Sequence, residues 1–332
     1  MSKDKILNLL RISRTEFLSG EELAKRCSIS RTMVWKHIKS LKQDGFRIRA
    51  VPSQGYLLMD EPDILRKSDV LQGLKTEVIG REIHILRVTS STNTHAMEMA
   101  SDGSPEGTVV VAETQTGGKG RLGRTWASPK GNLYFSIIFR PNIPLRKAPL
   151  ITLMGAVAVA STLKAVYNVQ ATIKWPNDIF VSSKKISGLL TEMSAEQDRI
   201  KHIVLGIGIN VNITLNALPA EVRTSATTLV EETGQKINRK MLLCQLLMEL
   251  ERWYRIFLGD VDCMLREWKA FNMTIGNRVT VQGMGESFEG DAVGIDTEGR
   301  LLIKLADGIL RPIAAGDVTL QRGQNSKSNP PI

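Results

Sequence analysis

The segment richest in residues able to do chemistry is QTGGKGRLGRTW, at positions 115–126. Four of the seven residues from 117 to 123 are glycines, which let a backbone turn sharply and approach a ligand closely. Lys119, Arg121 and Arg124 add positive charge among these glycines. Flexible glycines combined with cations suit a polyphosphate or an acyl-adenylate, and a basic loop without a ligand is the alternative.

Two common phosphate-binding motifs do not describe this loop. A Walker A loop requires the pattern GxxxxGK[ST], which the segment lacks. A Rossmann GxGxxG turn opens a helix, whereas the residues after this loop predict a strand. The loop therefore belongs to a different class of ligand site.

Polar side chains also cluster at the ends of two predicted strands. Ser91, Thr92 and Asn93 precede an expected helix, where they can bind a small polar ligand or a carboxylate, or simply cap the helix. In the segment KWPND, proline stops the strand, so Asn177 and Asp178 project from a turn. The amide can contact a base or a ribose, and the carboxylate can take a cation or a ribose hydroxyl.

Two later segments add a lysine and an amide. KKISGLLTE predicts a turn and a strand that carry Lys185, and GIGINVN ends another strand with Asn210. No activated serine or cysteine nucleophile is evident, and the histidines and cysteines lack the spacing of zinc ligands. We expect the three cysteines to be thiols in a reducing cytoplasm; they are Cys27, Cys244 and Cys263.

These clusters require a sheet that brings strand ends together. The predicted strands lie at 83–88, 108–113, 132–139 and 203–212, with another ending in KWPND. The predicted helices lie at 64–74, 94–100, 150–167, 239–258 and 261–271. This pattern predicts a central mixed α/β domain over 63–274.

From residue 277 the pattern changes to short strands with glycine turns. Five strands are expected, at 278–281, 287–295, 301–305, 309–313 and 318–320. They predict a small SH3-like β-barrel over 275–322. The polar residues 323–332 predict a flexible tail.

The first 59 residues are strongly basic. They carry twelve Lys or Arg against five Asp or Glu, which is +7 of the chain's net +10. Such a block indicates a polyanion partner, usually nucleic acid, with a solvated basic face as the alternative. A helix at 3–14, a second capped by Ser19, and a third at 31–44 closed by Gly45 predict a helix-turn-helix.

The third helix carries the side chains expected to face a DNA groove. They are Ser30, Arg31, Thr32, Trp35, Lys36 and Lys39. An alternating segment at 46–51, a turn at 52–55 and a strand at 56–59 add a basic hairpin. The region 1–62 is therefore predicted to be a winged helix-turn-helix that binds DNA, and a winged helix used only for protein contacts is the alternative.

Length and composition exclude several classes of protein. The chain has 332 residues, of which 42% are hydrophobic and 23% charged. These values exclude collagen, a disulfide-stapled mini-protein and a mostly disordered chain. Because the sequence has no run of 18 apolar residues and no signal-peptide pattern, we expect a cytoplasmic protein without a membrane span.

Taken together and in this order, the segments GGKGRLGRTW, KWPNDI, KKISGLLTE and GIGINVN resemble the biotin protein ligases. The winged helix in front makes the chain similar to the bifunctional kind that is also the biotin operon repressor. The resemblance covers about residues 5–320 and implies a multidomain α+β protein with a class II synthetase-like ligase domain. Members often have a more arginine-rich loop, and Lys119 and Leu122 stand at two of those positions here.

The resemblance implies a two-step reaction. Biotin and ATP, with Mg²⁺, give biotinoyl-5′-AMP and pyrophosphate. The biotinoyl group then passes to one lysine of a biotin carboxyl carrier protein, in acetyl-CoA carboxylase or pyruvate carboxylase. The resemblance also implies a homodimer that the adenylate promotes, partly by sheet extension, and that binds operator DNA. Such an enzyme aligns reactants and neutralises charge without covalent catalysis.

The resemblance further assigns roles to residues. Lys185 would bridge biotin's carboxylate and the α-phosphate, Arg121 would stabilise the anhydride, and Arg124 completes the catalytic set. The residues that the resemblance assigns to biotin are Ser91, Thr92, Asn93, Gln115, Gly118, Lys119, Gly120, Arg121, Lys185, Gly188 and Gly206. Those that it assigns to ATP are Arg121, Arg124, Trp126, Asn177, Asp178 and Asn210, with no fixed metal site and Mg²⁺ near Asp178. Gly188 and Gly208 would be sites of close approach.

Two other functions stay open on the sequence. One is a ligand-sensing repressor without catalysis, which the retained Arg121, Lys185, Asn177 and Asp178 argue against. The other is a lipoate or octanoate ligase, which shares the architecture, although the glycine and arginine loop favours biotin. The operator, the acceptor and the oligomeric state without ligand do not follow from the sequence.

Overall fold

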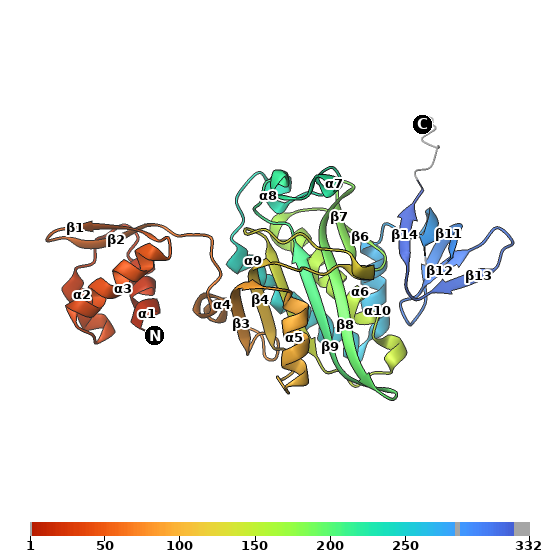
Figure 1. Cartoon of the computed structure of the whole chain (residues 1–332), viewed down its shortest axis with the longest axis horizontal. Helices are drawn as coiled ribbons and strands as arrows, with labels where there is room; N and C mark the ends of the chain where they lie inside the picture. The colour runs from red at the N-terminus through yellow and green to blue at the C-terminus, as the bar shows by residue number, and fades with distance from the viewer. Residues whose placement is uncertain (1, 283–285, 322–332) are drawn as a thin grey trace. The chain divides into compact units, whose positions relative to one another are not determined.

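The structure of the chain is a computed structural model that describes residues 2–282 and 286–321 (Figure 1). The chain divides into two compact units, Met1–Ile64 and Leu65–Ile332. This division falls two residues after the predicted end of the DNA-binding domain. The tail predicted at 323–332 lies outside the described residues.

The N-terminal unit contains three helices and a two-stranded hairpin. These elements are α1 (Ser2–Ile12), α2 (Gly20–Cys27), α3 (Arg31–Gln43), β1 (Arg47–Val51) and β2 (Gly55–Asp60). The Ser19 hydroxyl accepts a hydrogen bond from the Glu22 amide, and the Ser30 hydroxyl accepts one from the Met33 amide. Both side chains therefore cap the helices that follow them, as predicted.

The helices of this unit bury their apolar stripes against one another. Leu10, Leu23 and Ile38, one from each helix, belong to a single buried cluster. The third helix ends at Gln43, and Gly45 follows with a φ of 94°, the left-handed conformation that its position predicts. The winged helix-turn-helix expected from the sequence is confirmed.

A seven-stranded mixed sheet forms the body of the second unit, with the order β3-β4-β5-β9-β8-β7-β6. Its strands are β3 (Ile83–Thr89), β4 (Val109–Gln115), β5 (Leu133–Phe139), β6 (Ala171–Lys174), β7 (Asp178–Val181), β8 (Lys184–Glu196) and β9 (Arg199–Ile209). Within this sheet β3 and β4 run parallel, and the other neighbouring pairs are antiparallel. The predicted mixed α/β domain is thus present.

Helices cover both faces of this sheet (Figure 1). One face packs against α6 (Leu150–Tyr167), on which α9 (Arg239–Gly259) and α10 (Val261–Phe271) pack in turn. The other face packs against α5 (Thr92–Ser101). The segment Leu145–Tyr167 is long and apolar enough to span a membrane, but most of it is buried inside this unit as its core helix.

The C-terminal strands form a separate antiparallel sheet with the order β13-β12-β11-β10-β14. They are β10 (Arg278–Gln282), β11 (Ser287–Ile295), β12 (Leu301–Lys304), β13 (Leu310–Ile313) and β14 (Asp317–Leu320). All five predicted strands are present. The start of β14 lies against the glycine-rich loop of the central domain, a contact described below.

Several boundaries differ from those predicted, and three of the differences have a clear local cause or size. Helix α5 begins at Thr92 rather than at 94, because the Ser91 hydroxyl accepts from the Thr94 amide and caps the helix earlier. The helix predicted at 64–74 is the shorter α4 (Lys67–Gly73). Strand β9 ends at Ile209, one residue before the Asn210 that was predicted to end it, and the amide of Val211 donates to the side chain of Asn132 instead of a neighbouring strand.

Candidate functional site

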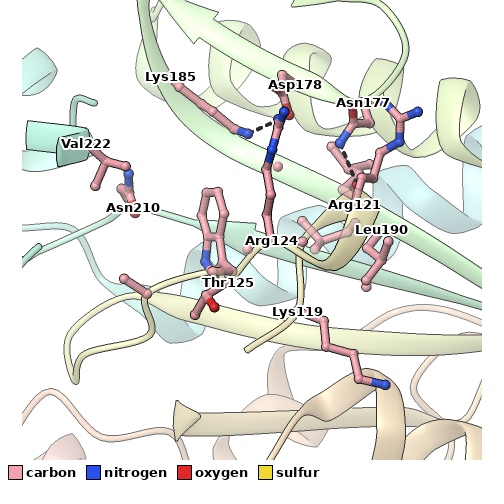
Figure 2. A pocket seen from close by; sticks show the side chains of 18 of the residues that line it. Lys119, Arg121, Arg124, Thr125, Asn177, Asp178, Lys185, Leu190, Asn210 and Val222 are labelled. Atoms are coloured by element: carbon pink, nitrogen blue, oxygen red, sulfur yellow. Dashed lines mark hydrogen bonds and ion pairs between the residues drawn. The ribbon is translucent and has the colours of Figure 1, made fainter. Parts of the chain in front are cut away.

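A pocket of about 350 Å³ lies at the end of the sheet where β3, β4 and β9 finish (Figure 2). It is lined by every residue predicted to bind biotin or ATP except Gly118. Those that line it are Ser91, Thr92, Asn93, Gln115, Lys119, Gly120, Arg121, Arg124, Trp126, Asn177, Asp178, Lys185, Gly188, Gly206 and Asn210. The fold therefore gathers segments that are widely separated in the chain.

Gly118 lies at the base of the glycine-rich loop rather than in the pocket wall. Its carbonyl accepts from the Trp126 amide at 2.8 Å, so the two residues close the loop. A Cβ at position 118 would lie 2.4 Å from the carbonyl oxygen of Trp126. This glycine is required by the loop's own backbone.

Part of the pocket is a set of hydrogen-bonded polar residues, which we call the polar floor. Thr92, Asn93 and Gln115 line the pocket, and Ser128 and Ser136 are hydrogen-bonded to them outside its lining. The side-chain oxygen of Gln115 accepts from the backbone amide of Thr92 at 2.7 Å and from the Thr92 hydroxyl at 3.1 Å. Its amide nitrogen donates to the Ser128 hydroxyl at 2.8 Å. These bonds fix the orientation of the Gln115 amide before a ligand binds.

Asn93 is the most constrained side chain of the polar floor. Its oxygen accepts from the Ser136 hydroxyl at 2.7 Å, and its nitrogen donates to a Glu192 carboxylate oxygen at 2.8 Å. A Cβ at position 206 would lie 2.0 Å from the Asn93 oxygen. The close approach expected at Gly206 is thus to Asn93, a protein side chain.

A second part of the pocket carries positive charge, and we call Lys185, Arg121 and Arg124 the cationic rim. The Lys185 ammonium lies 2.7 Å from a carboxylate oxygen of Asp178 and 5.3 Å from the centre of the Trp126 ring. Figure 2 shows the two charged side chains pointing toward one another. Lys185 thus sits between a carboxylate and an aromatic face.

Trp126 lies over two glycines on neighbouring strands. A Cβ on Gly208 would lie 2.5 Å from the indole nitrogen, and one on Gly188 would lie 3.0 Å from the ring. The indole N–H is buried without a hydrogen-bond partner in the described structure. The predicted close approach at Gly188 and Gly208 is therefore to the indole of Trp126.

The two arginines of the rim both contact the segment at the start of β14: Arg121 the preceding Gly316, and Arg124 its first residue. Arg121 donates to the side chain of Asn177 at 3.2 Å and to the carbonyl of Gly316 at 3.3 Å, and Arg124 pairs with the carboxylate of Asp317. Burial lowers the pKa of the Arg121 guanidinium, and Asp178 opposes this effect. A guanidinium stays charged under such conditions, so Arg121 remains a cation.

Positive charge exceeds negative charge at this end of the pocket. Lys174, at the end of β6, is a further cation close to Asp178, Lys185 and Arg124, and burial is the main cause that lowers its pKa. Two carboxylates line the pocket here, those of Asp178 and Asp317. This surplus favours an anionic ligand.

Two predicted ligand-binding amides are already engaged within the protein. Asn177 accepts from Arg121 and donates to the carbonyl of Leu189 at 2.9 Å. Asn210 is 3% exposed; it accepts from Asn132 at 3.2 Å and donates to the carbonyl of Thr227 at 3.1 Å. Both side chains line the pocket, and both also connect segments of its wall.

The sequence did not single out Ser136, Glu192 or Asp317. Ser136 is fully buried on β5, Glu192 lies on β8, and Asp317 lies on a strand of the C-terminal sheet. Glu192 closes the segment KKISGLLTE but had no role assigned to it, and Ser136 and Asp317 belong to no motif. Each meets its partner only in the folded chain. The wall at 218–226, which contributes Leu218, Pro219, Val222, Ser225 and Ala226, was missed for the same reason.

The sequence predicts no fixed metal site here, only Mg²⁺ near Asp178. The described residues contain no group of three or more His, Cys, Asp or Glu side chains that could hold an ion. Mg²⁺ usually keeps several waters and binds one or two carboxylates together with substrate phosphates. Asp178 is a carboxylate of the kind that such a metal takes.

The N-terminal unit presents the predicted DNA-facing residues to solvent. Ser30, Arg31, Thr32, Trp35, Lys36 and Lys39 are all exposed, while Val34, Ile38 and Leu41 on the same helix are buried. The Lys39 ammonium lies 5.3 Å from the centre of the Trp35 ring, which is 54% exposed. A basic helix face with an exposed aromatic side chain suits a DNA groove.

Comparison with protein families gives three matches along the chain. The biotin/lipoate A/B protein ligase family matches residues 85–210. A helix-turn-helix domain matches residues 3–57, and the biotin protein ligase C-terminal domain matches residues 274–320. The three matched regions follow the order of the DNA-binding unit, the mixed sheet and the C-terminal sheet.

Individual proteins match over nearly the whole chain. The bifunctional ligase/repressor BirA of Bacillus subtilis is 41% identical over 318 residues, which are 95% of this chain and 97% of that protein. The protein of the same name from Escherichia coli is 29% identical over 96% of this chain and 97% of its own length. The solved biotin protein ligase of Aquifex aeolicus, in complex with biotin and ATP, matches 73% of this chain and 100% of its own, with 30% identity and a TM-score of 0.63.

Proposed function

The chain belongs to the family of bifunctional biotin protein ligases and repressors, and we propose that it activates biotin with ATP and transfers it to a carrier protein. The observation that carries the proposal is the pocket in which a hydrogen-bonded polar floor faces a cationic rim. The floor suits the uncharged ureido end of biotin. The rim suits the carboxylate of biotin and the phosphates of ATP.

At the cationic rim, Lys185 bridges the biotin carboxylate and the α-phosphate. Both groups are anionic, so the carboxylate oxygen must approach phosphorus against charge repulsion. An ammonium between them lowers that repulsion and stabilises the charge that develops during transfer. Lys185, which pairs with Asp178 without substrates, would supply this ammonium. Asp178 would be the carboxylate that holds a magnesium ion bound with the nucleotide, where the ion would neutralise phosphate charge.

Arg121 and Arg124 hold the reactive product. The adenylate is a mixed anhydride that water can hydrolyse, so the enzyme must keep it covered. Arg121 lies between the pocket and the C-terminal sheet, where its fork can bind a carboxyl or phosphate oxygen. Trp126 lies beside Lys185, and its ring provides a face for the adenine.

At the polar floor, Thr92, Asn93 and Gln115 recognise biotin through positions fixed by their internal hydrogen bonds. Gly118, Lys119 and Gly120 belong to the loop that closes over it. The acceptor is the lysine of a biotin carboxyl carrier domain in a cytoplasmic carboxylase. Its amine attacks the biotinoyl carbonyl, and AMP leaves with the anhydride oxygen.

The basic winged helix supports binding to operator DNA, and the repressor names of the relatives support regulation of transcription. The proposed signal is biotinoyl-AMP, which favours a homodimer and so pairs two winged helices. Arg31, Thr32 and Lys36 are the first residues to test for base contacts.

Biotin-dependent exchange between ATP and labelled pyrophosphate tests the ligase. Exchange that requires biotin supports adenylation, whereas exchange that requires lipoate instead would assign the chain to the lipoate branch. Absence of exchange with both acids would leave a ligand-sensing DNA-binding protein. Operator affinity measured with and without the adenylate tests the repressor, because equal affinities would contradict the proposed regulation.

A further inference from the structure

A buried ion pair lies outside the pocket and is not used by the mechanism above. Arg239, the first residue of α9, has no exposed surface, and Glu113 on β4 is 8% exposed. One guanidinium nitrogen of Arg239 lies 2.8 Å from a carboxylate oxygen of Glu113. Desolvation of both charges opposes such a pair, so its attraction alone is weak evidence for a stabilising role. The other partners of each side chain indicate what it positions.

Glu113 connects to the point where the chain enters the catalytic unit. Its second carboxylate oxygen accepts from the backbone amide of Leu65 at 2.8 Å. Leu65 is the first residue of that unit and directly follows the DNA-binding unit. The carboxylate therefore fixes Leu65, the point where the two units join, with the same group that holds Arg239.

Arg239 connects in the other direction, toward the pocket. Its second terminal nitrogen donates to the carbonyl of Asn132 at 2.8 Å. Asn132 is fully buried, and its side-chain amide donates to Asn210 at 3.2 Å and accepts from the Val211 amide at 2.8 Å. The guanidinium thus holds the residue that orients Asn210.

From Asn210 the connection reaches the backbone of Lys185. Asn210 donates to the carbonyl of Thr227 at 3.1 Å, and the Thr227 amide donates to the carbonyl of Lys185 at 3.0 Å. The Lys185 amide in turn donates to the carbonyl of Ser225 at 2.7 Å. The segment 225–227 therefore forms a short ladder with Lys185, and Asn210 anchors that ladder. We call the series from Leu65 to Lys185 the Glu113–Arg239 relay.

We propose that Glu113 and Arg239 are positioning residues for adenylation. They hold the Lys185 backbone and the segment 225–227 in place, and they fix both relative to Leu65, where the catalytic unit begins. This inference rests on the proposed function. Neither residue lines the pocket, so neither touches substrate. A misplacement of about 1 Å at a reacting group can lower a rate about 10²-fold. Loss of contacts in the relay should therefore lower the rate of adenylation, although the relay lies outside the pocket.

Arg239→Lys is the most informative variant. Lysine keeps the positive charge beside Glu113, but a single ammonium lacks the planar fork that also reaches the Asn132 carbonyl. Glu113→Gln removes the charge and keeps the size of the side chain. For each variant we expect kcat of biotin-dependent pyrophosphate exchange to fall about tenfold. KM for biotin stays within about twofold of wild type, because no residue of the polar floor belongs to the relay.

Glu251→Gln is a matched control on the same helix, α9. Glu251 is 7% exposed and accepts from the backbone amides of Glu77, Val78 and Ile79, each at 2.8 Å. It is thus a buried carboxylate that anchors a backbone segment outside the relay. We expect this variant to unfold at a lower temperature and to keep the wild-type kcat.

Several outcomes would overturn the inference. Folded Arg239→Lys with wild-type kcat contradicts it, and so does an equal loss of kcat in Glu251→Gln. If Glu113→Gln does not fold, Asn132→Ala breaks the relay nearer the pocket, and a folded Asn132→Ala protein with wild-type kcat contradicts the inference as well. A wild-type chain without biotin-dependent exchange would instead contradict the proposed function itself.

Discussion

The polar floor and the cationic rim line the same pocket but differ in the partners that their side chains have without a ligand. In the floor, Thr92 and Gln115 bond mainly to neutral neighbours, in a partly buried network. In the rim, Lys185 and Arg124 pair with the carboxylates of Asp178 and Asp317. Buried neutral networks fix a geometry, whereas ion pairs that stay partly exposed, as both of these do, contribute little energy and exchange partners readily.

This difference indicates how the two ends recognise their ligands. The floor keeps its hydrogen bonds and offers a preformed surface to an uncharged ring. The rim exchanges protein carboxylates for the phosphates and carboxylate of the substrates. Substitutions in the polar floor should therefore change KM for biotin, and substitutions in the cationic rim should change KM for ATP or kcat.

The largest effect is expected from Lys185→Ala in the cationic rim. Loss of the ammonium between the two reacting anions should lower kcat of pyrophosphate exchange about 10³-fold, since preorganised electrostatic groups contribute 10²–10³-fold each. Biotin affinity, measured by calorimetry, should fall much less. Lys184→Ala is the control, because Lys184 is an exposed lysine next to it in the chain and does not line the pocket. Equal losses in both variants would contradict the assigned role.

Gly206→Ala and Gly208→Ala test the comparison on one strand, two residues apart. The first variant displaces Asn93 and should raise KM for biotin about 30-fold, as expected for a lost buried hydrogen bond. The second displaces Trp126 and should raise KM for ATP by a similar factor. Steady-state kinetics with each substrate varied separately measures both. If each variant raises both KM values equally, the two ends are not distinct.

Arg121→Ala should weaken retention of the adenylate more than binding of biotin or ATP. Without this guanidinium the loop covers the adenylate less well, so we expect biotinoyl-AMP to leave about tenfold faster while exchange continues. Release can be followed by trapping free adenylate after a single turnover. Retention equal to wild type would show that other groups hold the anhydride.

The smallest effect is expected from Asp317→Asn at the edge of the rim. The change frees Arg124, which no longer has to leave a carboxylate when phosphate binds. KM for ATP should fall about two- to threefold, since Arg124 is mostly exposed in this pair. Asp307→Asn removes the same charge from an exposed turn of the same sheet and should change nothing. An increase in KM for Asp317→Asn would mean that the carboxylate assists the nucleotide.

Local signals explain which parts of the molecule could be predicted. The helix caps Ser19 and Ser30 and the glycine after α3 act within a few residues of their own position, and the periodic apolar stripes define each helix. The glycine-rich loop was recognised because glycine and arginine determine its flexibility and charge directly. For α5, the same rules misplaced the start by two residues, because Ser91 and not a later residue is its cap.

The sequence by itself determined the elements and the winged helix, because propensity, capping and charge are properties of short segments. The resemblance of its motifs to a known family supplied most of the residues that line the pocket. Only the tertiary structure decided what those residues face. It placed Gly206 against Asn93, Gly208 against Trp126 and Asp317 against Arg124. It also joined Glu113 to Arg239 across 126 residues of chain. The packing of distant strands and helices determines these contacts, and the spacing of residues along the chain does not indicate them.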